Sequence, residues 1–263
     1  MFPEFLITLR ESLEAALVVG IILAYLEKTR NTAYNRHVYL GVAAGVLASI
    51  IAALLIQSVL GEFEGVVENL FEGSLMLSAA ILMGWMIIWM MNQGNVRAQI
   101  EAGVQEKISA GKVVGLVLFT FLSVFREGVE TVIFISAEMV QDSRNALLGV
   151  IIGFSAAVAL AFLIFETAIK VDLRRFFTAT SIVLAVFAAG IFAHGMHEFQ
   201  EAAWLPQQQE MWNTKHILDD ESSMGAIVRA LTGYNDNPTP LEGIAYVGYY
   251  GAFLVVYSTM KRR

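Results

Sequence analysis

Two short segments of this chain carry arginine and glutamate in the same order inside otherwise apolar stretches. Each segment reads Arg-Glu-x-x-Glu, first at Arg10–Glu14 and again at Arg126–Glu130. Residues three and four apart share one face of a helix, so each copy presents two carboxylates, with the arginine within reach of the second. Four carboxylates and two guanidiniums sum to a charge of −2, which a bound cation or protonation of the carboxylates would relieve. The alternative is structural: each arginine neutralises its own glutamates, and these bridges lock two helices together.

The side chains available restrict which cation such a site could hold. The chain contains no cysteine, which excludes thiolate and iron–sulfur sites. Carboxylate oxygens suit a hard or borderline cation such as iron, manganese, magnesium or calcium, and they argue against copper(I). The spacing of the glutamates does not choose among these ions.

The elements that must position these charges are membrane-spanning helices. The 263 residues are 57% hydrophobic and 16% charged, whereas an ordinary soluble domain has about 25% charged residues. A helix that crosses a bilayer needs about 20 apolar residues, and we predict an all-α integral membrane protein with seven transmembrane helices. This composition excludes a large soluble domain, and a net charge of −7 does not indicate a nucleic-acid partner. The predicted spans are 4–26, 38–60, 70–91, 112–138, 146–168, 177–199 and 242–260.

The distribution of lysine and arginine predicts how the chain enters the membrane. Of 17 such residues, twelve fall on one side of the predicted spans, three on the other side and two inside the spans. Because basic loops stay in the cytoplasm, the amino terminus is predicted outside and the carboxyl terminus inside. We therefore expect a multi-pass protein of the cytoplasmic membrane, meaning the inner or plasma membrane, embedded in its lipid bilayer.

The two motifs also mark an internal repeat. The first unit covers about 1–91 and the second about 112–199, and each contains three predicted spans. Because three is an odd number, the units cross the membrane in opposite directions, which makes an inverted 3+3 repeat of the kind found in secondary transporters. A single transmembrane permease domain, 1–263, then comprises both units, an extracytoplasmic loop at about 200–241 and one extra helix at about 242–260.

Glycine and methionine residues in the predicted spans are interpreted as packing residues. Gly41 and Gly45 in the second span match Gly149 and Gly153 in the fifth, and small residues four apart let two helix backbones approach closely. Methionine at helical spacing is most often an adaptable core residue. The third span has five methionines, at Met76, Met83, Met86, Met90 and Met91.

Acidic and histidine residues gather on the side predicted to be outside, in two groups with spacings of three or four. One group is Glu64, Glu68 and Glu72, and the other is His194, His197, Glu198 and Glu201. Such spacing places each group on one helix face, where carboxylates and imidazoles could capture a metal ion. For Glu64, the alternative is a solvated loop without a ligand role. Further along, Asp219 and Asp220 fit an ordinary polar loop better than a second ligand cluster.

With its motifs in the first and fourth of seven spans, the chain resembles the iron permease family, which includes the fungal high-affinity ferric permeases and the bacterial inner-membrane iron transporters. Further matching segments are Phe71–Gly73, Trp85–Met91 and His197–Ala202. The third residue of the family's motif is usually glycine. This chain keeps it as Gly128 in the second copy and has Ser12 in the first.

The resemblance implies an iron importer and not an enzyme, with no cofactor beyond the transported Fe²⁺ or Fe³⁺. The iron ligands it implies are Glu11, Glu14, Glu127 and Glu130, with Arg10 and Arg126 as their charge-balancing partners. On the outer face, the expected ligands are Glu72, His197 and Glu198, and the further capture residues are Glu64, Glu68, His194 and Glu201. An extracytoplasmic oxidase or iron-delivery protein is an expected partner, and a homo-oligomer is also considered.

Two other functions fit parts of the pattern. The same architecture could carry another divalent metal such as manganese, with or without coupling to protons. A membrane-embedded carboxylate di-iron oxidase would instead be an enzyme. Its sites usually combine glutamates with Glu-x-x-His motifs on facing helices, and no glutamate here is followed three residues later by histidine.

Overall fold

Long helices account for most of this computed structural model, which describes residues 2–60, 63–92, 96–109, 113–141, 146–166, 173–220 and 222–261. The described residues contain no strand. The helices are α1 (Phe2–Lys28), α2 (Asn35–Leu60), α3 (Val66–Asn92), α4 (Val96–Ser109), α5 (Val113–Gln141), α6 (Ala146–Glu166), α7 (Leu173–Glu201), α8 (Ser223–Thr232) and α9 (Pro240–Lys261), with a short 3₁₀ turn, η1 (Thr32–Tyr34), before α2. Within the described residues, a helix occupies every apolar stretch predicted as a span.

Helix length and composition identify a helical membrane protein. By these criteria alone, four helices of the described residues could cross a bilayer, at Thr32–Val59, Val66–Met91, Ala146–Phe165 and Arg175–Glu201. Helices α1, α5 and α9 are 27, 29 and 22 residues long, which also exceeds the length needed. The first two carry the repeated Arg-Glu-x-x-Glu motif in their interior, and the third contains four tyrosines.

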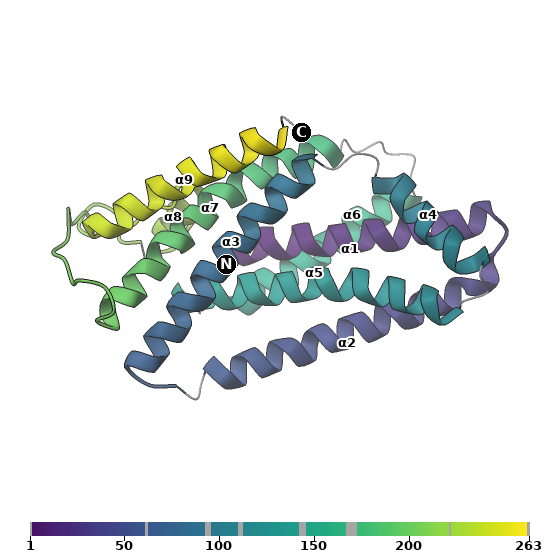
Figure 1. Ribbon diagram of the computed structural model, residues 1–263, viewed down its shortest axis with the longest axis horizontal. Helices are drawn as coiled ribbons and strands as arrows, with labels where there is room; N and C mark the ends of the chain where they lie inside the picture. The colour runs from purple at the N-terminus through teal and green to yellow at the C-terminus, as the bar shows by residue number, and fades with distance from the viewer. Residues whose placement is uncertain are drawn as a thin grey trace.

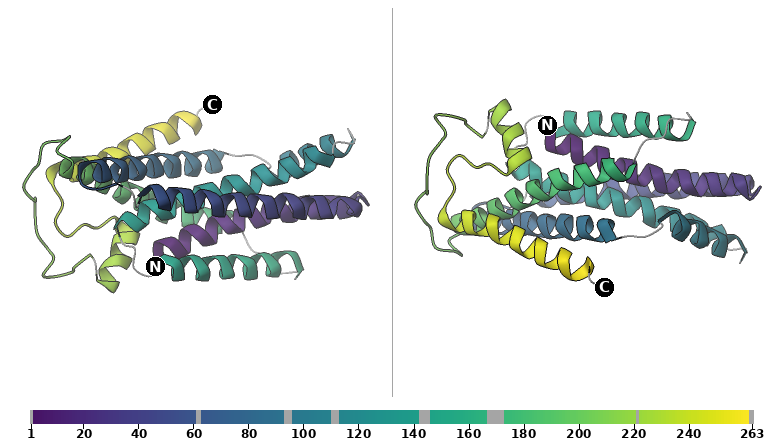
Figure 2. Two further views of the ribbon diagram at one scale, coloured as in Figure 1. Left: turned by 90° about the horizontal axis from the view of Figure 1, so that it is seen from below. Right: turned by 90° about the horizontal axis from the view of Figure 1, so that it is seen from above.

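The helices pack in pairs that join the two halves of the chain. α1 packs along α6, α2 along α5 and α3 along α7, while α1 and α5 also touch each other. Figure 1 shows α1, α2 and α5 running along the long axis of the molecule, whereas α3, α7 and α9 lie side by side at an angle to them. In the two further views, α6 lies at one edge of the molecule and α9 at the opposite edge (Figure 2). The contact between α1 and α5 brings the two charged motifs together.

Close approach of the paired helices depends on glycine, as predicted. An ideal Cβ added to Gly153 of α6 would lie 2.6 Å from the carbonyl oxygen of Phe5 in α1. In α2, a Cβ added to Gly41 would lie 2.7 Å from a backbone carbonyl oxygen of α5. A Cβ added to Gly45 would lie 3.1 Å from the carbonyl oxygen of Phe121, also in α5. A Cβ would collide with backbone at Gly41 and Gly153 and would be tightly packed at Gly45, which confirms the packing role of these three glycines.

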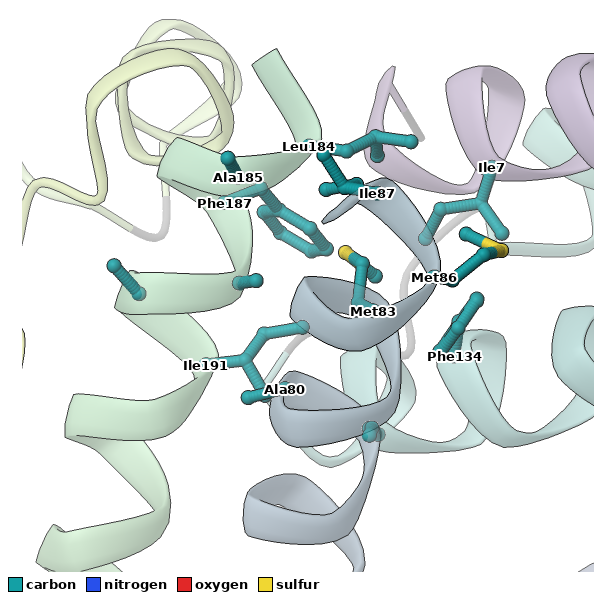
Figure 3. Packing of buried hydrophobic residues seen from close by; sticks show 14 of the residues in the cluster. Ile7, Ala80, Met83, Met86, Ile87, Phe134, Leu184, Ala185, Phe187 and Ile191 are labelled. Atoms are coloured by element: carbon teal, nitrogen blue, oxygen red, sulfur yellow. The ribbon is translucent and has the colours of Figure 1, made fainter. Parts of the chain in front are cut away.

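The largest buried apolar cluster lies between α3 and α7 and extends to α1 and α5. Figure 3 shows Met83 among residues of α3 and α7, and Met86 facing Ile7 of α1 and Phe134 of α5. Met76 and Met83 are both fully buried in this cluster, which confirms their role as packing residues.

Two helices lie outside the predicted spans. α4 packs on α1 through Ile100 and Val104, and an ion pair of 2.8 Å joins Arg97 to Glu101. α8 begins with a cap in which the Ser222 hydroxyl accepts from a backbone N–H, and it ends at a glycine with a left-handed backbone conformation. With 14 and 10 residues, both helices are too short to cross a bilayer. They lie at opposite ends of the molecule (Figure 1).

Candidate metal centre

The first motif lies on α1 and is sealed from solvent. The side chains of Arg10 and Glu11 are fully buried, and that of Glu14 is 14% exposed. Arg10 Nη1 donates to Glu11 Oε1 at 2.6 Å, and Arg10 Nη2 lies 3.0 Å from Glu14 Oε1. The arginine therefore pairs with both glutamates of its own copy, and not only with the one four residues away.

The second motif lies on α5 and has the same pairing, but its arginine is more open. Arg126 Nη2 donates to Glu127 Oε1 at 2.5 Å, and Arg126 Nε lies 3.6 Å from Glu130 Oε1. Glu127 is buried, whereas the Arg126 side chain is 52% exposed. The two copies are thus alike in sequence and different in environment.

Three of the four predicted ligands meet where α1 crosses α5. One carboxylate oxygen from each of Glu11, Glu14 and Glu127 can be chosen so that all lie within 4.8 Å of one another. Glu11 Oε2 and Glu127 Oε2 are buried and have no hydrogen-bond partner. Carboxylates held this close repel each other unless a cation lies between them. Glu130 is not part of this close group, and its carboxylate is paired with Arg126.

Residues of α3 complete the surroundings of both arginines. Arg10 Nη1 donates to Met86 Sδ at 3.3 Å, and Arg10 Nη2 donates to Met90 Sδ at 2.7 Å. The guanidinium carbon of Arg126 lies 5.3 Å from the centre of the Trp89 ring, a cation–π contact. Interpretation of the methionines as core packing missed these contacts. Their only signal in the sequence is the spacing of Met86 and Met90, which lie four residues apart in the third predicted span.

A cavity of about 1050 Å³ adjoins the carboxylates, between α1, α2, α5 and α6. Glu11 and Glu127 form part of its wall. Its lining on α1 continues as far as Glu27, which at 1.5 Å per residue is about 24 Å beyond Glu11. Ser49 and Thr131 add hydroxyl groups to a lining that is otherwise mostly apolar. Two of the clustered carboxylates therefore lie beside a large cavity.

The outer-face residues come together in the structure, because the start of α3 packs against the end of α7. An ideal Cβ at Gly73 would lie 3.1 Å from Glu198 Cβ, and Asn69 Nδ2 donates to Glu201 Oε2 at 3.3 Å. Glu68 and Glu72 therefore lie beside the acidic end of α7. Glu64 precedes α3 and is exposed.

The two histidines of α7 are engaged with carboxylates. His197 Nδ1 lies 2.9 Å from Glu242 Oε1 and His197 Nε2 lies 3.2 Å from Glu201 Oε1, while His194 Nε2 is 3.7 Å from Glu198 Oε1. Both ring nitrogens of His197 thus have partners, one of them on α9. Among the described residues, the ligand atoms of this outer group do not come as close together as those of the α1–α5 cluster.

Glu242 is a residue of this site that the motifs did not reveal. It is buried and accepts from Thr239 N at 3.1 Å, while Glu242 N donates to Thr239 Oγ1 at 3.3 Å. This reciprocal pair is a capping box at the start of α9. The Thr-x-x-Glu pattern could have predicted the cap, but not its contact with His197.

Asp219 and Asp220 lie close to the buried Asp236, with carboxylate oxygens within 4.8 Å of one another. Asp236 Oδ2 accepts from the backbone N–H of Asp220 at 3.3 Å. The acidic residues of this loop therefore lie close together in the structure. The hydrogen bond to the backbone also gives this group a role in holding the loop.

Comparison with known proteins covers almost the whole chain. A family model described as "Iron permease FTR1 family" matches residues 1–260. A ferrous iron permease EfeU of Shigella sonnei (strain Ss046) is 33% identical over 267 residues, which is 100% of this chain and 97% of the relative. A ferrous iron permease EfeU of Escherichia coli O6:K15:H31 is 33% identical over 98% of this chain and 95% of its own length, and one of Yersinia pestis is 31% identical over 98% and 93%. No solved structure matches the chain.

Proposed function

Because the chain belongs to the iron permease FTR1 family, we propose that it imports iron ions through an intramembrane carboxylate site between α1 and α5. The chain is a transporter and not an enzyme, since the family and its named relatives are permeases. The observation that carries the site is the close group of carboxylate oxygens from Glu11, Glu14 and Glu127. The relatives are named ferrous iron permeases, and we infer Fe²⁺ as the ion.

The charges of the site suit a transported cation. Four carboxylates and two guanidiniums sum to −2, and one Fe²⁺ would neutralise this charge. Glu130 is the proposed fourth ligand, and it reaches the ion once Arg126 turns away from it. An inward-negative potential assists entry by about 2.3 kcal/mol per charge per 100 mV. Arg10 and Arg126 then pair with the glutamates again when the ion leaves.

Iron is proposed to reach this site from the acidic outer ends of α3 and α7. Glu72, His197 and Glu198 are the proposed ligands there. The further capture residues are Glu64, Glu68, His194 and Glu201. The packing of Gly73 against Glu198 supports this grouping. For His197 to bind a metal, one of its carboxylate partners must leave a ring nitrogen.

An inverted 3+3 repeat, with α9 as a seventh membrane-crossing helix, is supported by the exchange of partners between the halves. The first helix of each unit packs on the second helix of the other, in the pairs α1–α6 and α5–α2, and the third helices, α3 and α7, pack together. Matched residues make matched contacts: Gly153 approaches the Phe5 carbonyl and Gly45 the Phe121 carbonyl. This swapped arrangement fits one transmembrane domain in which one repeat rocks against the other.

We place the amino terminus outside and the carboxyl terminus in the cytoplasm of a cell's inner or plasma membrane. α4 packs against the end of α1 that leads into the basic α1–α2 connection, while the acidic loops lie at the opposite end (Figure 1). Several of the counted basic residues lie outside the described residues: Lys112, Arg144, Lys170, Arg262 and Arg263. In this orientation the large cavity extends from the carboxylates toward the cytoplasm, with Glu27 near its inner end.

Transport by purified protein tests the cargo. Reconstituted into vesicles, the permease is expected to accumulate Fe²⁺ under anaerobic conditions, and an excess of Mn²⁺ is expected to compete poorly. Strong competition by Mn²⁺ would favour the alternative of a broader divalent-metal transporter. If an imposed proton gradient does not change the rate of iron uptake, transport is not coupled to protons. The di-iron oxidase is not favoured, because oxygen consumption has no support in the family.

Cysteine accessibility tests the orientation, and the absence of native cysteine makes the labelling clean. A cysteine at Ala24, which lines the cavity, is expected to react with a membrane-impermeant thiol reagent only in inside-out vesicles. A cysteine at the exposed Gln209 is expected to react only in right-side-out vesicles. The reverse pattern would invert the topology, and no reaction at position 24 from either face would mean that the cavity is not a water-filled route.

The remaining partners are predictions that follow from the proposed role. No cofactor beyond the transported iron is expected. An extracytoplasmic oxidase or iron-delivery protein would hand iron to the acidic outer face. Association with a second copy of the chain also stays a prediction.

A further inference from the structure

Arg10 lies between two pairs of acceptors of different kinds. On one side are the carboxylates of Glu11 and Glu14, and on the other the thioether sulfurs of Met86 and Met90. Each terminal nitrogen contacts one member of each pair: Nη1 has Glu11 at 2.6 Å and Met86 at 3.3 Å, and Nη2 has Glu14 at 3.0 Å and Met90 at 2.7 Å. A small shift of the guanidinium would move it from one pair toward the other.

An iron ion on the carboxylates would compete with this guanidinium. Two cations on the same buried oxygens repel each other strongly, because little solvent screens them. Arg10 is fully buried, so water is not at hand to accept its donors. Its Nε already has no hydrogen-bond partner. Once displaced from the glutamates, its terminal nitrogens need other acceptors, since an unsatisfied buried donor is costly.

We propose that Met86 and Met90 are positioning residues that hold the Arg10 guanidinium while iron occupies Glu11 and Glu14. A thioether sulfur is a weak, polarizable acceptor. It can therefore hold Arg10 when iron occupies the carboxylates, yet it is too weak to draw Arg10 from them when the site is empty. A stronger acceptor at these positions would keep Arg10 away from the glutamates permanently, and a leucine side chain would offer no acceptor. This inference rests on the proposed iron site.

The same stretch of α3 also serves the second arginine. Trp89, between the two methionines, lies under Arg126. Sulfur and aromatic faces are both neutral surfaces that attract a cation without holding a formal charge. Residues 86–90 of α3 thus form an uncharged support for both guanidiniums. This coincidence is unexpected if the methionines only fill space.

Leucine substitutions test the role of the sulfurs, because leucine replaces methionine with little change in volume. In the Met86→Leu/Met90→Leu variant, anaerobic Fe²⁺ binding to the purified permease is expected to weaken about tenfold, which corresponds to about 1.4 kcal/mol. In vesicles, KM for Fe²⁺ is expected to rise by a similar factor while the maximal rate stays within about twofold. The matched control is Met76→Leu/Met83→Leu, which changes two buried methionines of the same helix and is expected to leave both constants unchanged.

A double-mutant cycle separates a contact with Arg10 from a general packing effect. In an Arg10→Gln background, the Met86→Leu/Met90→Leu change is expected to have no further effect on Fe²⁺ binding. Three results would each overturn the inference. Fe²⁺ binding could weaken equally with and without Arg10, it could weaken equally in the control pair, or it could stay unchanged in the Met86→Leu/Met90→Leu variant. Glu11→Gln is measured in parallel: if it leaves Fe²⁺ binding intact, the proposed site itself fails. If Glu11→Gln abolishes binding and the leucine pair does not weaken it, only the role of the methionines fails.

Discussion

Glutamine at both Glu11 and Glu127 is expected to lower iron uptake by roughly a hundredfold or more, since loss of supporting residues alone can cost a metal site 10–100-fold. These two carboxylates come from different helices, are almost fully buried, and belong to the close group of ligand oxygens. The amide keeps the size of the side chain and removes its charge. The site would then lose two of its negative charges and its bridge between α1 and α5. Uptake of Fe²⁺ into vesicles at matched protein content measures the effect.

Folding is expected to survive this double change. After it, two carboxylates and two guanidiniums remain, so the buried charges balance through Arg10 with Glu14 and Arg126 with Glu130. The control is Glu106→Gln on α4, where the same chemical change falls on a side chain that is 72% exposed, and uptake should stay normal. Normal iron accumulation by the Glu11→Gln/Glu127→Gln variant would contradict the proposed site. Thermal unfolding in detergent shows whether a loss of uptake is instead a loss of structure.

Leucine at Gly153 is expected to destabilise the permease by about 3 kcal/mol or more, at the upper end of overpacking effects. The new Cβ would meet the Phe5 carbonyl oxygen at 2.6 Å and the Leu9 backbone nitrogen at 3.1 Å. Backbone atoms inside a helix cannot move aside as a flexible side chain can, so α6 would be pushed away from α1. Because α1 carries Glu11 and Glu14, iron uptake should fall together with stability. The midpoint of unfolding in detergent and the yield of monodisperse protein measure the change.

A matched glycine shows whether the close approach is the cause. Gly248 lies within α9 with no atom within 4 Å of its ideal Cβ, so Gly248→Leu is expected to leave stability close to that of the unchanged protein. If the Gly153→Leu and Gly248→Leu variants are equally stable, the contact between α1 and α6 is looser than described. The inverted repeat adds a second comparison, because Gly45→Leu should also be destabilising through its contact with Phe121 and Val124.

Several predictions from sequence were met because they depend on local properties of the chain. Long apolar runs form helices in a membrane, where each backbone group must bond within its own segment. For this reason helices occupy the predicted stretches, and helices α1 and α5 carry the two charged motifs at helical spacing. The packing of Gly41, Gly45 and Gly153 was predictable for a similar reason, since small residues four apart form a shallow face on any helix.

Other features depend on distant parts of the chain. α4 and α8 are short helices in the connections between spans. The long apolar runs that predict membrane spans therefore did not predict them. The contact of His197 with Glu242 joins α7 to α9, and no local pattern links these residues. Met86 and Met90 have the spacing of ordinary core residues, and only the position of α1 beside α3 makes them partners of Arg10.

By itself, the amino-acid sequence determined the types and spacing of the charged groups, the helices that carry them and the family to which they belong, because these are properties of consecutive residues. Only the tertiary structure decided that the two copies of the motif are unequal. Arg10 is fully buried against the sulfurs of α3, whereas the Arg126 side chain is 52% exposed beside Trp89, and Glu130 lies apart from the group formed by Glu11, Glu14 and Glu127. Identical spacing on two helices cannot specify this difference, because burial is set by which neighbouring helices pack on each copy.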